Sequence, residues 1–246
     1  MRPLWFQTPV LNSAMPEPAA IDYGNKWNRI LKAEEVSSAV FIDFEARKEG
    51  PQTLLGVLTP DNDFTQYVVD PFFDSAAEAK RKGSCPKCWC LSASLTDAIE
   101  KAAQAAHTSG GPIVGFTRHE FEVVLNHARK YASAWKELYR DGKPTAKRWA
   151  RRLHPDYEFV KRPGSGRYSL DQFFELAEYE VPRIHGAGNT GNRISYVQKQ
   201  LDRHESYEQI TPTAKKKWTN LLMHNYHDIH GLRGLVQVAT KDLAGR

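Results

Sequence analysis

The chain has 246 residues, of which 41% are hydrophobic and 26% charged, and its formal net charge is +5. No run reaches the ~18 apolar residues of a membrane span, no basic segment followed by an apolar core indicates a secretory signal, and three cysteines confined to residues 85–90 exclude a disulfide framework. We therefore expect a cytoplasmic protein whose mild basicity permits a polyanionic partner without requiring one.

The first predicted strand covers residues 39–45 and ends in two acids. Residues 1–36 before it, rich in proline at the beginning, are expected to form an irregular arm, and residues 37–246 a single domain. Because side chains alternate along a strand, Asp43 and Glu45 point to the same face. Burying two carboxylates beside apolar residues is costly unless they are compensated, and a divalent ion compensates them most simply. The alternative is a strand end with solvated acids.

The next elements alternate strands with helices. Residues 53–58 and 65–69 are predicted as strands that complete an antiparallel meander of three. A periodic, alanine-rich helix is predicted over residues 95–107, followed by a short buried strand over 113–116. Thr117 and Glu120 have the spacing of a capping box, which predicts a long helix that continues to about residue 139.

The second half of the chain is basic and helical. Residues 129–167 contain twelve Lys or Arg against four acids, a local net charge of +8, with aromatic residues between them. Helices are predicted over 170–179, over 194–204 and from Pro212 to beyond Asp228. The glycine-rich residues 186–191 match a dinucleotide-binding spacing, but no clear strand precedes them and the chain has no Walker-type loop, so we expect no nucleotide cofactor.

Three acidic motifs occur in the order of a known nuclease fold. Phe41-Ile42-Asp43-Phe44-Glu45 resembles the first motif of DEDD-type (DnaQ-like) 3′–5′ exonucleases, residues 113–120 resemble the second, and residues 224–229 resemble the third. The nearest similarity is to the predicted RecB-family and YprB-like nuclease branch. The resemblance covers roughly residues 39–238 and implies an α/β fold with a ribonuclease-H-like mixed sheet, an antiparallel meander of three strands plus parallel strands, flanked by helices.

The resemblance also implies an activity and its metal ligands. Hydrolysis of a phosphodiester bond uses two divalent ions to stabilise the attacking and the leaving oxygen. The implied ligands for Mg²⁺ or Mn²⁺ are Asp43, Glu45, Glu120 and Asp228. The family usually has Asp in the second motif, whereas this chain has Glu. Glu120 fits the capping turn beside the short strand, and Glu122 is the alternative register.

His224 lies one helical turn before Asp228, so both side chains are expected on one helix face. The spacing is that of the exonucleases with Tyr at this position, while the residue is that of the histidine branch. We therefore predict a catalytic set of His224, Asp43, Glu45 and Asp228, with His224 as the base that orients or deprotonates water. The alternative is an ordinary surface or core histidine.

Two further predictions concern binding. Lys147, Arg148, Arg151 and Arg152 are expected to contact nucleic acid (DNA or RNA) phosphates, the alternative being a solvated helix face. Zn²⁺ at Cys85, Cys88 and Cys90 is a weaker hypothesis, because three thiolates need a fourth ligand such as His107, His119 or His154.

The sequence leaves rival interpretations of the whole chain. One is a catalytically degenerate ribonuclease-H-like module that binds nucleic acid or a protein partner, which the second-motif Glu favours. The other is an unrelated basic α/β scaffold, which requires Asp43 and Asp228 to lie far apart.

Overall fold

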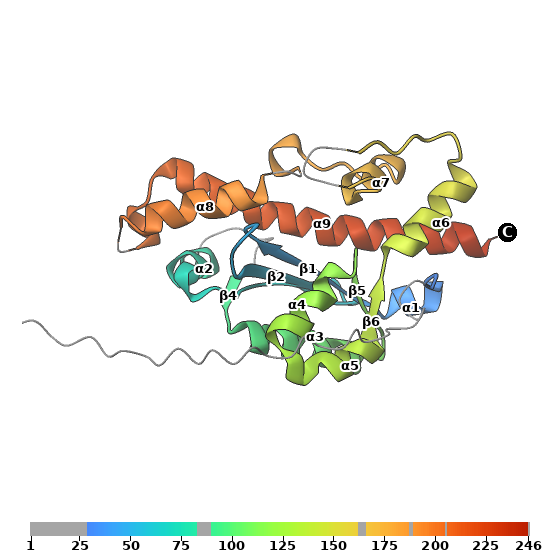
Figure 1. Ribbon diagram of the computed structural model, residues 1–246, viewed down its shortest axis with the longest axis horizontal. Helices are drawn as coiled ribbons and strands as arrows, with labels where there is room; N and C mark the ends of the chain where they lie inside the picture. The colour runs from blue at the N-terminus through green and yellow to red at the C-terminus, as the bar shows by residue number, and fades with distance from the viewer. Residues whose placement is uncertain (1–28, 83–89, 162–165, 187–188, 205, 246) are drawn as a thin grey trace, which may run out of the picture.

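The computed structural model describes residues 29–82, 90–161, 166–186, 189–204 and 206–245. Its centre is a six-stranded mixed sheet in the order β4-β3-β2-β1-β5-β6 (Figure 1). The strands are β1 Val40–Ala46, β2 Gln52–Leu58, β3 Phe64–Val68, β4 Cys90–Ser92, β5 Ile113–Gly115 and β6 Tyr139–Asp141. β1, β2 and β3 form an antiparallel meander, while β4 runs parallel to β3, β5 to β1 and β6 to β5. This arrangement confirms the predicted α/β class and has ribonuclease-H-like topology.

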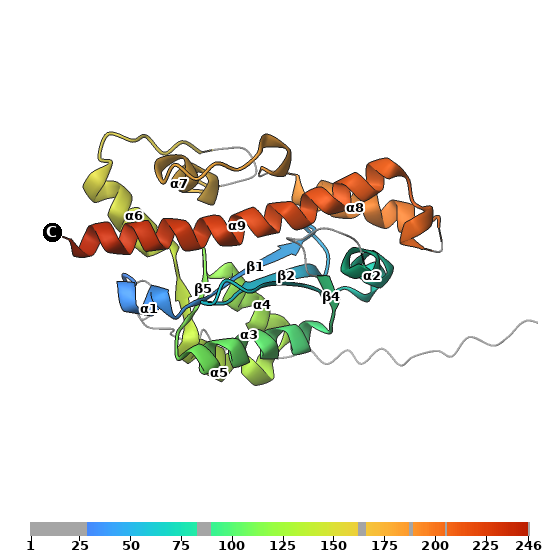
Figure 2. The same cartoon turned by 180° about the vertical axis from the view of Figure 1, so that it is seen from behind.

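Helices cover both faces of the sheet. They are α1 Ala33–Ser37, α2 Asp74–Lys82, α3 Leu95–Ser109, α4 His119–His127, α5 Ala132–Leu138, α6 Lys143–Leu153, α7 Leu170–Leu176, α8 Thr190–Leu201 and α9 Pro212–Ala244. Helices α3, α4 and α5 lie on one side of the sheet, and the long α9 crosses the other side together with α6, α7 and α8 (Figures 1 and 2). Among the described residues no helix is long and apolar enough to cross a bilayer.

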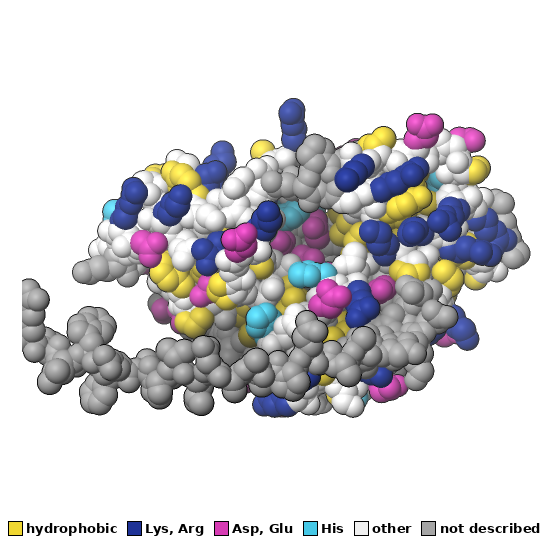
Figure 3. Space-filling view, viewed as in Figure 1, with side chains coloured by type: hydrophobic (Ala, Val, Ile, Leu, Met, Phe, Trp, Pro, Cys, Tyr) yellow, Lys and Arg dark blue, Asp and Glu magenta, His cyan; other side chains and the backbone are white. Residues whose placement is uncertain are grey.

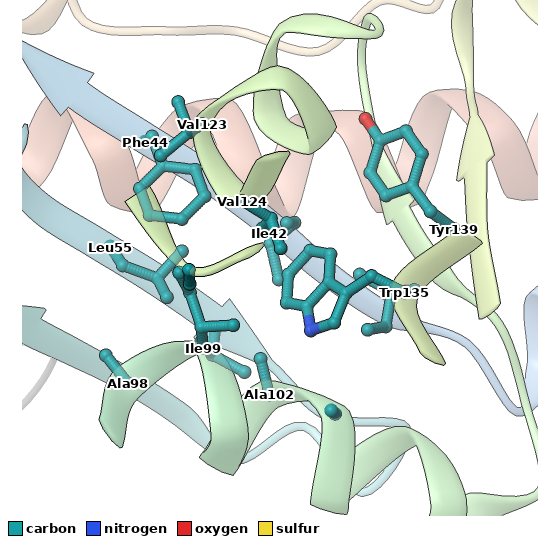
Figure 4. Close-up of a cluster of buried hydrophobic side chains, with 14 of the residues drawn as sticks. Ile42, Phe44, Leu55, Ala98, Ile99, Ala102, Val123, Val124, Trp135 and Tyr139 are labelled. Atoms are coloured by element: carbon teal, nitrogen blue, oxygen red, sulfur yellow. The ribbon is translucent and has the colours of Figure 1, made fainter. Parts of the chain in front are cut away.

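The alternation of β1 divides its side chains between two cores. Val40, Ile42 and Phe44 pack with α3, α4 and α5, as the close-up of this cluster shows (Figure 4). Phe41 belongs to the core under α9. Asp43 and Glu45 have the parity of Phe41 and therefore face α9, which places two carboxylates between the sheet and the last helix.

A glycine in β2 lets α9 approach the sheet closely. Gly56 is the register partner of Asp43. A Cβ atom on Gly56 would lie 2.2 Å from Asn225 Oδ1 and 2.3 Å from Ile229 Cδ1, so no larger residue fits without displacing the helix. The middle of α9, from His224 to Asp228, thus lies directly against the strand that carries Asp43.

The structure corrects the prediction of one long helix after Thr117. The chain instead forms α4, a 3-10 turn at Arg129–Tyr131, and α5, and then enters strand β6 beside β5. Trp135 and Tyr139 are fully buried in the core of Figure 4, and their packing bends the chain back to the sheet. Propensity along the segment favours a continuous helix, but burial of these two rings outweighs it.

Candidate metal centre

Side chains from three elements meet beside the open end of β1. We call Asp43, Glu45, Glu120, His224 and Asp228 the acid cluster. Ligand atoms of Glu45, His224 and Asp228 all lie within 4.8 Å of one another. His224 Nε2 is 3.7 Å from Glu45 Oε1 and 3.6 Å from Asp228 Oδ2. In Figure 3 acidic side chains are visible at the bottom of a hollow near the middle of the face.

His224 presents its Nε2 lone pair to these carboxylates. Its Nδ1 lies 2.7 Å from the carbonyl oxygen of His185. Because a carbonyl only accepts hydrogen bonds, Nδ1 carries the proton and Nε2 is left unprotonated. Burial lowers the pKa of His224 to about 4, which keeps the ring neutral near pH 7. A neutral imidazole oriented through its other nitrogen is the form that binds metal ions or accepts a proton.

Asp43 is oriented by a buried polar chain from α9 and β3. Asn225 Nδ2 donates to Asp43 Oδ2 at 2.9 Å and to the Asp43 carbonyl at 3.1 Å. Asn225 Oδ1 in turn accepts from Gln66 Nε2 at 3.0 Å. Asn225 and Gln66 are fully buried, so the three groups hold one another in a single arrangement.

Glu120, and not Glu122, faces the other acids. Glu120 is buried at the start of α4, and its Oε2 lies 3.0 Å from the Tyr139 hydroxyl and accepts from the Thr117 backbone N–H at 3.3 Å. This reach back to Thr117 is one half of the predicted capping box. The other half is absent, because the residue before α4 is Arg118 and Thr117 Oγ1 accepts from the His119 N–H at 3.2 Å. Glu122 is half-exposed and pairs with Arg118 at 3.3 Å, outside the acid cluster.

The carboxyl groups raise one another's pKa. Burial, and then the charge of Asp228, raise the pKa of Asp43 to about 8. Burial and the nearby Asp43 raise the pKa of Glu120 to about 8, and the pKa of Glu45 rises from burial, Asp43 and Asp228. Burial and Asp171 of α7 raise the pKa of Asp228 to about 7. Full ionisation of so many close acids is unfavourable unless a cation shares the site.

The donor atoms fit a divalent ion. Glu45 Oε1 is buried and has no hydrogen-bond partner among the described residues, so one acceptor points into the cluster unused. Two carboxylates and one neutral imidazole supply oxygen and nitrogen ligands, a set that divalent metals accept. The sequence predicted His224 as a base, whereas its position between Glu45 and Asp228 makes it a potential ligand as well.

Sequence reasoning missed two neighbours from α7 and α8. The Arg193 guanidinium is buried, donates to the Ile184 carbonyl at 2.9 Å, and its charge lowers the pKa of Asp228. Asp171, at the start of α7, adds negative charge near Asp228 and raises its pKa. Neither residue belongs to a recognisable motif, so only the packing of α7 and α8 against α9 could identify them.

The other predicted site residues lie apart from the acid cluster. Lys147, Arg148, Arg151 and Arg152 are on α6, where Lys and Arg side chains gather to the right of the hollow in Figure 3. The Lys147 ammonium lies 4.6 Å from the centroid of the Tyr168 ring. For the zinc hypothesis, Cys85 and Cys88 lie outside the described residues, and Cys90 is buried in β4 with Sγ 4.0 Å from Gln66 Oε1.

Comparison of the chain with protein-family models, with curated proteins and with solved structures found no match in any of the three. What the chain does is therefore inferred from its own fold and from the geometry of the acid cluster.

Proposed function

We propose that the protein is a metal-dependent nuclease that hydrolyses nucleic acid phosphodiester bonds, acting as a 3′–5′ exonuclease with two divalent ions. The observation that carries this proposal is the grouping of Glu45 from β1 with His224 and Asp228 from α9, whose ligand atoms lie within 4.8 Å of one another. The charge of Asp228 raises the pKa of Asp43 in β1, and Asp43 raises the pKa of Glu120 in α4, so these two acids border the same group. Ribonuclease-H-like topology supports it, because Asp43 and Glu45 stand on the face of β1 that α9 covers.

In this proposal Asp43, Glu45, Glu120 and Asp228 hold two Mg²⁺ or Mn²⁺ ions, which would stabilise negative charge on the attacking and the leaving oxygen. His224 Nε2, neutral and unprotonated, accepts a proton from the attacking water. Asn225 keeps the Asp43 carboxylate in its orientation through the 2.9 Å hydrogen bond. The basic side of α6 would hold the phosphates of the strand beside the hollow.

A second candidate function is a degenerate module of the same fold that binds nucleic acid or a protein partner without cutting. The observation that favours it is the environment of Glu120. Its Oε2 accepts from the Thr117 N–H and lies 3.0 Å from the Tyr139 hydroxyl, whose shorter contact is to the Thr117 carbonyl. A carboxylate so engaged serves as a structural group of the α4 turn unless an ion competes for it.

The experiment that separates the two functions compares wild type with Asp43→Asn, using Asp61→Asn in the exposed β2–β3 turn as the matched control. Cleavage of end-labelled single-stranded DNA and RNA is followed with Mn²⁺, with Mg²⁺ and with EDTA. We expect cleavage only with metal, a fall of about a thousandfold or more in Asp43→Asn because an anionic ligand is lost, and no change in Asp61→Asn.

Binding of Mn²⁺ is measured in the same samples by calorimetry. A wild type that binds Mn²⁺ but cuts neither substrate would favour the binding module. A wild type that binds no divalent ion, with Asp43→Asn simply less stable, would make the acid cluster structural and contradict the nuclease proposal.

A further inference from the structure

A separate cavity of about 480 Å³ lies between α6 and the turn after β5. Its volume is within the range of small-ligand pockets. The charged side chains of its lining are Arg118, Asp141, Lys143, Lys147, Arg148 and Arg151. None of them belongs to the acid cluster, so the cavity is a distinct feature of the surface.

The rim of the cavity is basic because of the register of α6. Lys143, Lys147 and Arg151 follow one another at one-turn intervals, so their side chains lie along one helix face. Burial, followed by the positive charge of Lys147, lowers the pKa of Lys143. Cations held this close are stabilised by a bound anion, and phosphate is the anion that Lys and Arg bind best.

The lining of the cavity also presents a buried hydrogen-bond acceptor, Asp141, near the positive charges of Arg118 and Lys143. Asp141, in the edge strand β6, is only 8% exposed, and its Oδ1 accepts no hydrogen bond from the described residues. A buried acceptor without a donor is unfavourable, and a phosphate group cannot relieve it because it too is an acceptor. A ligand that fits both regions therefore combines an anionic group with an N–H group.

The cavity adjoins the acid cluster through one residue. Thr117 lines the cavity, and its backbone N–H donates to Glu120 Oε2 at 3.3 Å. A strand whose scissile phosphate lies at the acid cluster therefore has a neighbouring nucleotide within reach of α6.

We propose that this cavity binds one unpaired nucleotide of the substrate strand, with its phosphate on the basic rim and a hydrogen-bond donor of its base on Asp141. That the nucleotide belongs to a nucleic acid substrate rests on the proposed function, whereas binding of a free nucleotide to the cavity does not. Guanine is the base whose Watson–Crick edge places two donors, N1–H and N2–H, side by side, and a carboxylate accepts both. The cavity thus favours guanine over uracil, whose single N–H stands between two carbonyl groups.

The test is calorimetric binding of GMP, AMP, CMP, UMP and ribose 5-phosphate to the full chain without metal. We expect GMP to bind about tenfold or more tightly than UMP, and Asp141→Asn to remove that preference. Arg148→Ala combined with Arg151→Ala, both at exposed positions, should weaken all four nucleotides alike, while exposed Lys216→Ala on α9 should change nothing.

The inference is overturned if no nucleotide binds, if ribose 5-phosphate binds as tightly as GMP, or if folded Asp141→Asn keeps the preference. Thermal melting checks the fold of each variant, and the exposed rim pair provides a second test if Asp141→Asn unfolds. Because Asp43→Asn should bind GMP like wild type, the two proposals fail separately. If the protein binds GMP but cuts no nucleic acid, only the nuclease proposal is contradicted. If it cuts nucleic acid but binds no free nucleotide, only the proposed nucleotide site is contradicted.

Discussion

Side chains of the acid cluster are oriented by hydrogen bonds from residues that are distant in the sequence. The His185 carbonyl fixes the tautomer of His224, and Asn225 fixes the rotamer of Asp43. The contact with His185 leaves Nε2 of His224 open, and Oε1 of the neighbouring Glu45 has no hydrogen-bond partner among the described residues. At this scale the site is a set of oriented acceptors, and their protonation decides its stability without metal.

The metal-free protein should lose stability as pH rises from about 6.5, above which the opposing effect of His224 has ended, to about 8. Asp43 and Asp228 have folded pKa values of about 8 and about 7, above their ordinary value of 3.8, so the folded state holds more protons than the unfolded state in that range. His224, with a pKa lowered to about 4 from 6.5, has the opposite effect, but only below its ordinary pKa. Urea unfolding in EDTA at about pH 6.5, 7.5 and 8.5 measures the trend.

In the same series Asp43→Asn should show a smaller loss of unfolding free energy across that range, because one of the titrating groups is gone. Asp61→Asn, in an exposed turn, should follow wild type. If Asp43→Asn and wild type give parallel curves, Asp43 is already ionised at about pH 6.5 and the proposed repulsion within the acid cluster is wrong.

Among the elements, β2 and α9 determine the geometry of the site by the closeness of their contact. Gly56 permits Asn225 and Ile229 to rest on the strand. On the far side of α9, Gly231 plays the same part toward α7, since a Cβ there would lie 2.4 Å from Phe174 Cζ. The helix that carries His224 and Asp228 is thus packed closely between the sheet and α7.

Gly56→Ala should destabilise the protein by about 1–3 kcal/mol and weaken Mn²⁺ binding, because the added methyl group pushes Asn225 away from Asp43. Gly234→Ala is the matched control: a Cβ there has nothing within 4 Å. Replacing a helix-interior glycine in open space should stabilise the protein by about 0.5–1 kcal/mol. Urea unfolding and Mn²⁺ calorimetry of both variants decide the matter, and an unchanged Mn²⁺ affinity in Gly56→Ala would show that α9 tolerates displacement.

The basic face of α6 should control affinity for nucleic acid through charge. Replacing Lys147, Arg148, Arg151 and Arg152 together by Ala should weaken binding of a single-stranded oligonucleotide. It should also flatten the plot of log affinity against log salt by about 0.7 for each lost phosphate contact. Arg203→Ala with Lys216→Ala, both exposed and outside this face, serves as control. A slope that does not change would mean that the α6 face is only solvated.

At the scale of the whole molecule, the acid cluster joins segments that the chain keeps far apart. Asp43 and Asn225 are separated by 182 positions, and Glu120 reaches the cluster from the opposite side of β1. Unfolding separates these acids, so the complete ligand set exists only in the folded state. A bound ion must therefore be linked to global stability.

Mn²⁺ should raise the melting temperature in a saturable way, with a gain in unfolding free energy of about 2.7 kcal/mol at a hundred times the dissociation constant. Asp228→Asn should remove most of this gain, because it deletes one of the ligands around His224. Asp61→Asn should retain it. Differential scanning calorimetry across a Mn²⁺ series makes the comparison, and an equal shift in wild type and Asp228→Asn would place the bound ion elsewhere.

The sequence by itself determined the features that depend on local periodicity. The alternation of residues 39–45 predicted that Asp43 and Glu45 share a face, and the one-turn spacing predicted that His224 and Asp228 do so on the last helix. The three-strand meander and the turn from Thr117 to Glu120 were equally readable, because each is set by neighbours a few residues apart.

Only the tertiary structure decided which acids meet and what surrounds them. It separated Glu120 from Glu122 by burying one and exposing the other, and it broke the predicted long helix so that Tyr139 could enter β6 and reach Glu120. It also brought Asn225 to Asp43 and Arg193 to Asp228. These contacts follow from the burial of whole helix faces against the sheet. The free energy of that burial is a sum over many residues that are distant in the sequence, so no local sequence pattern predicts it.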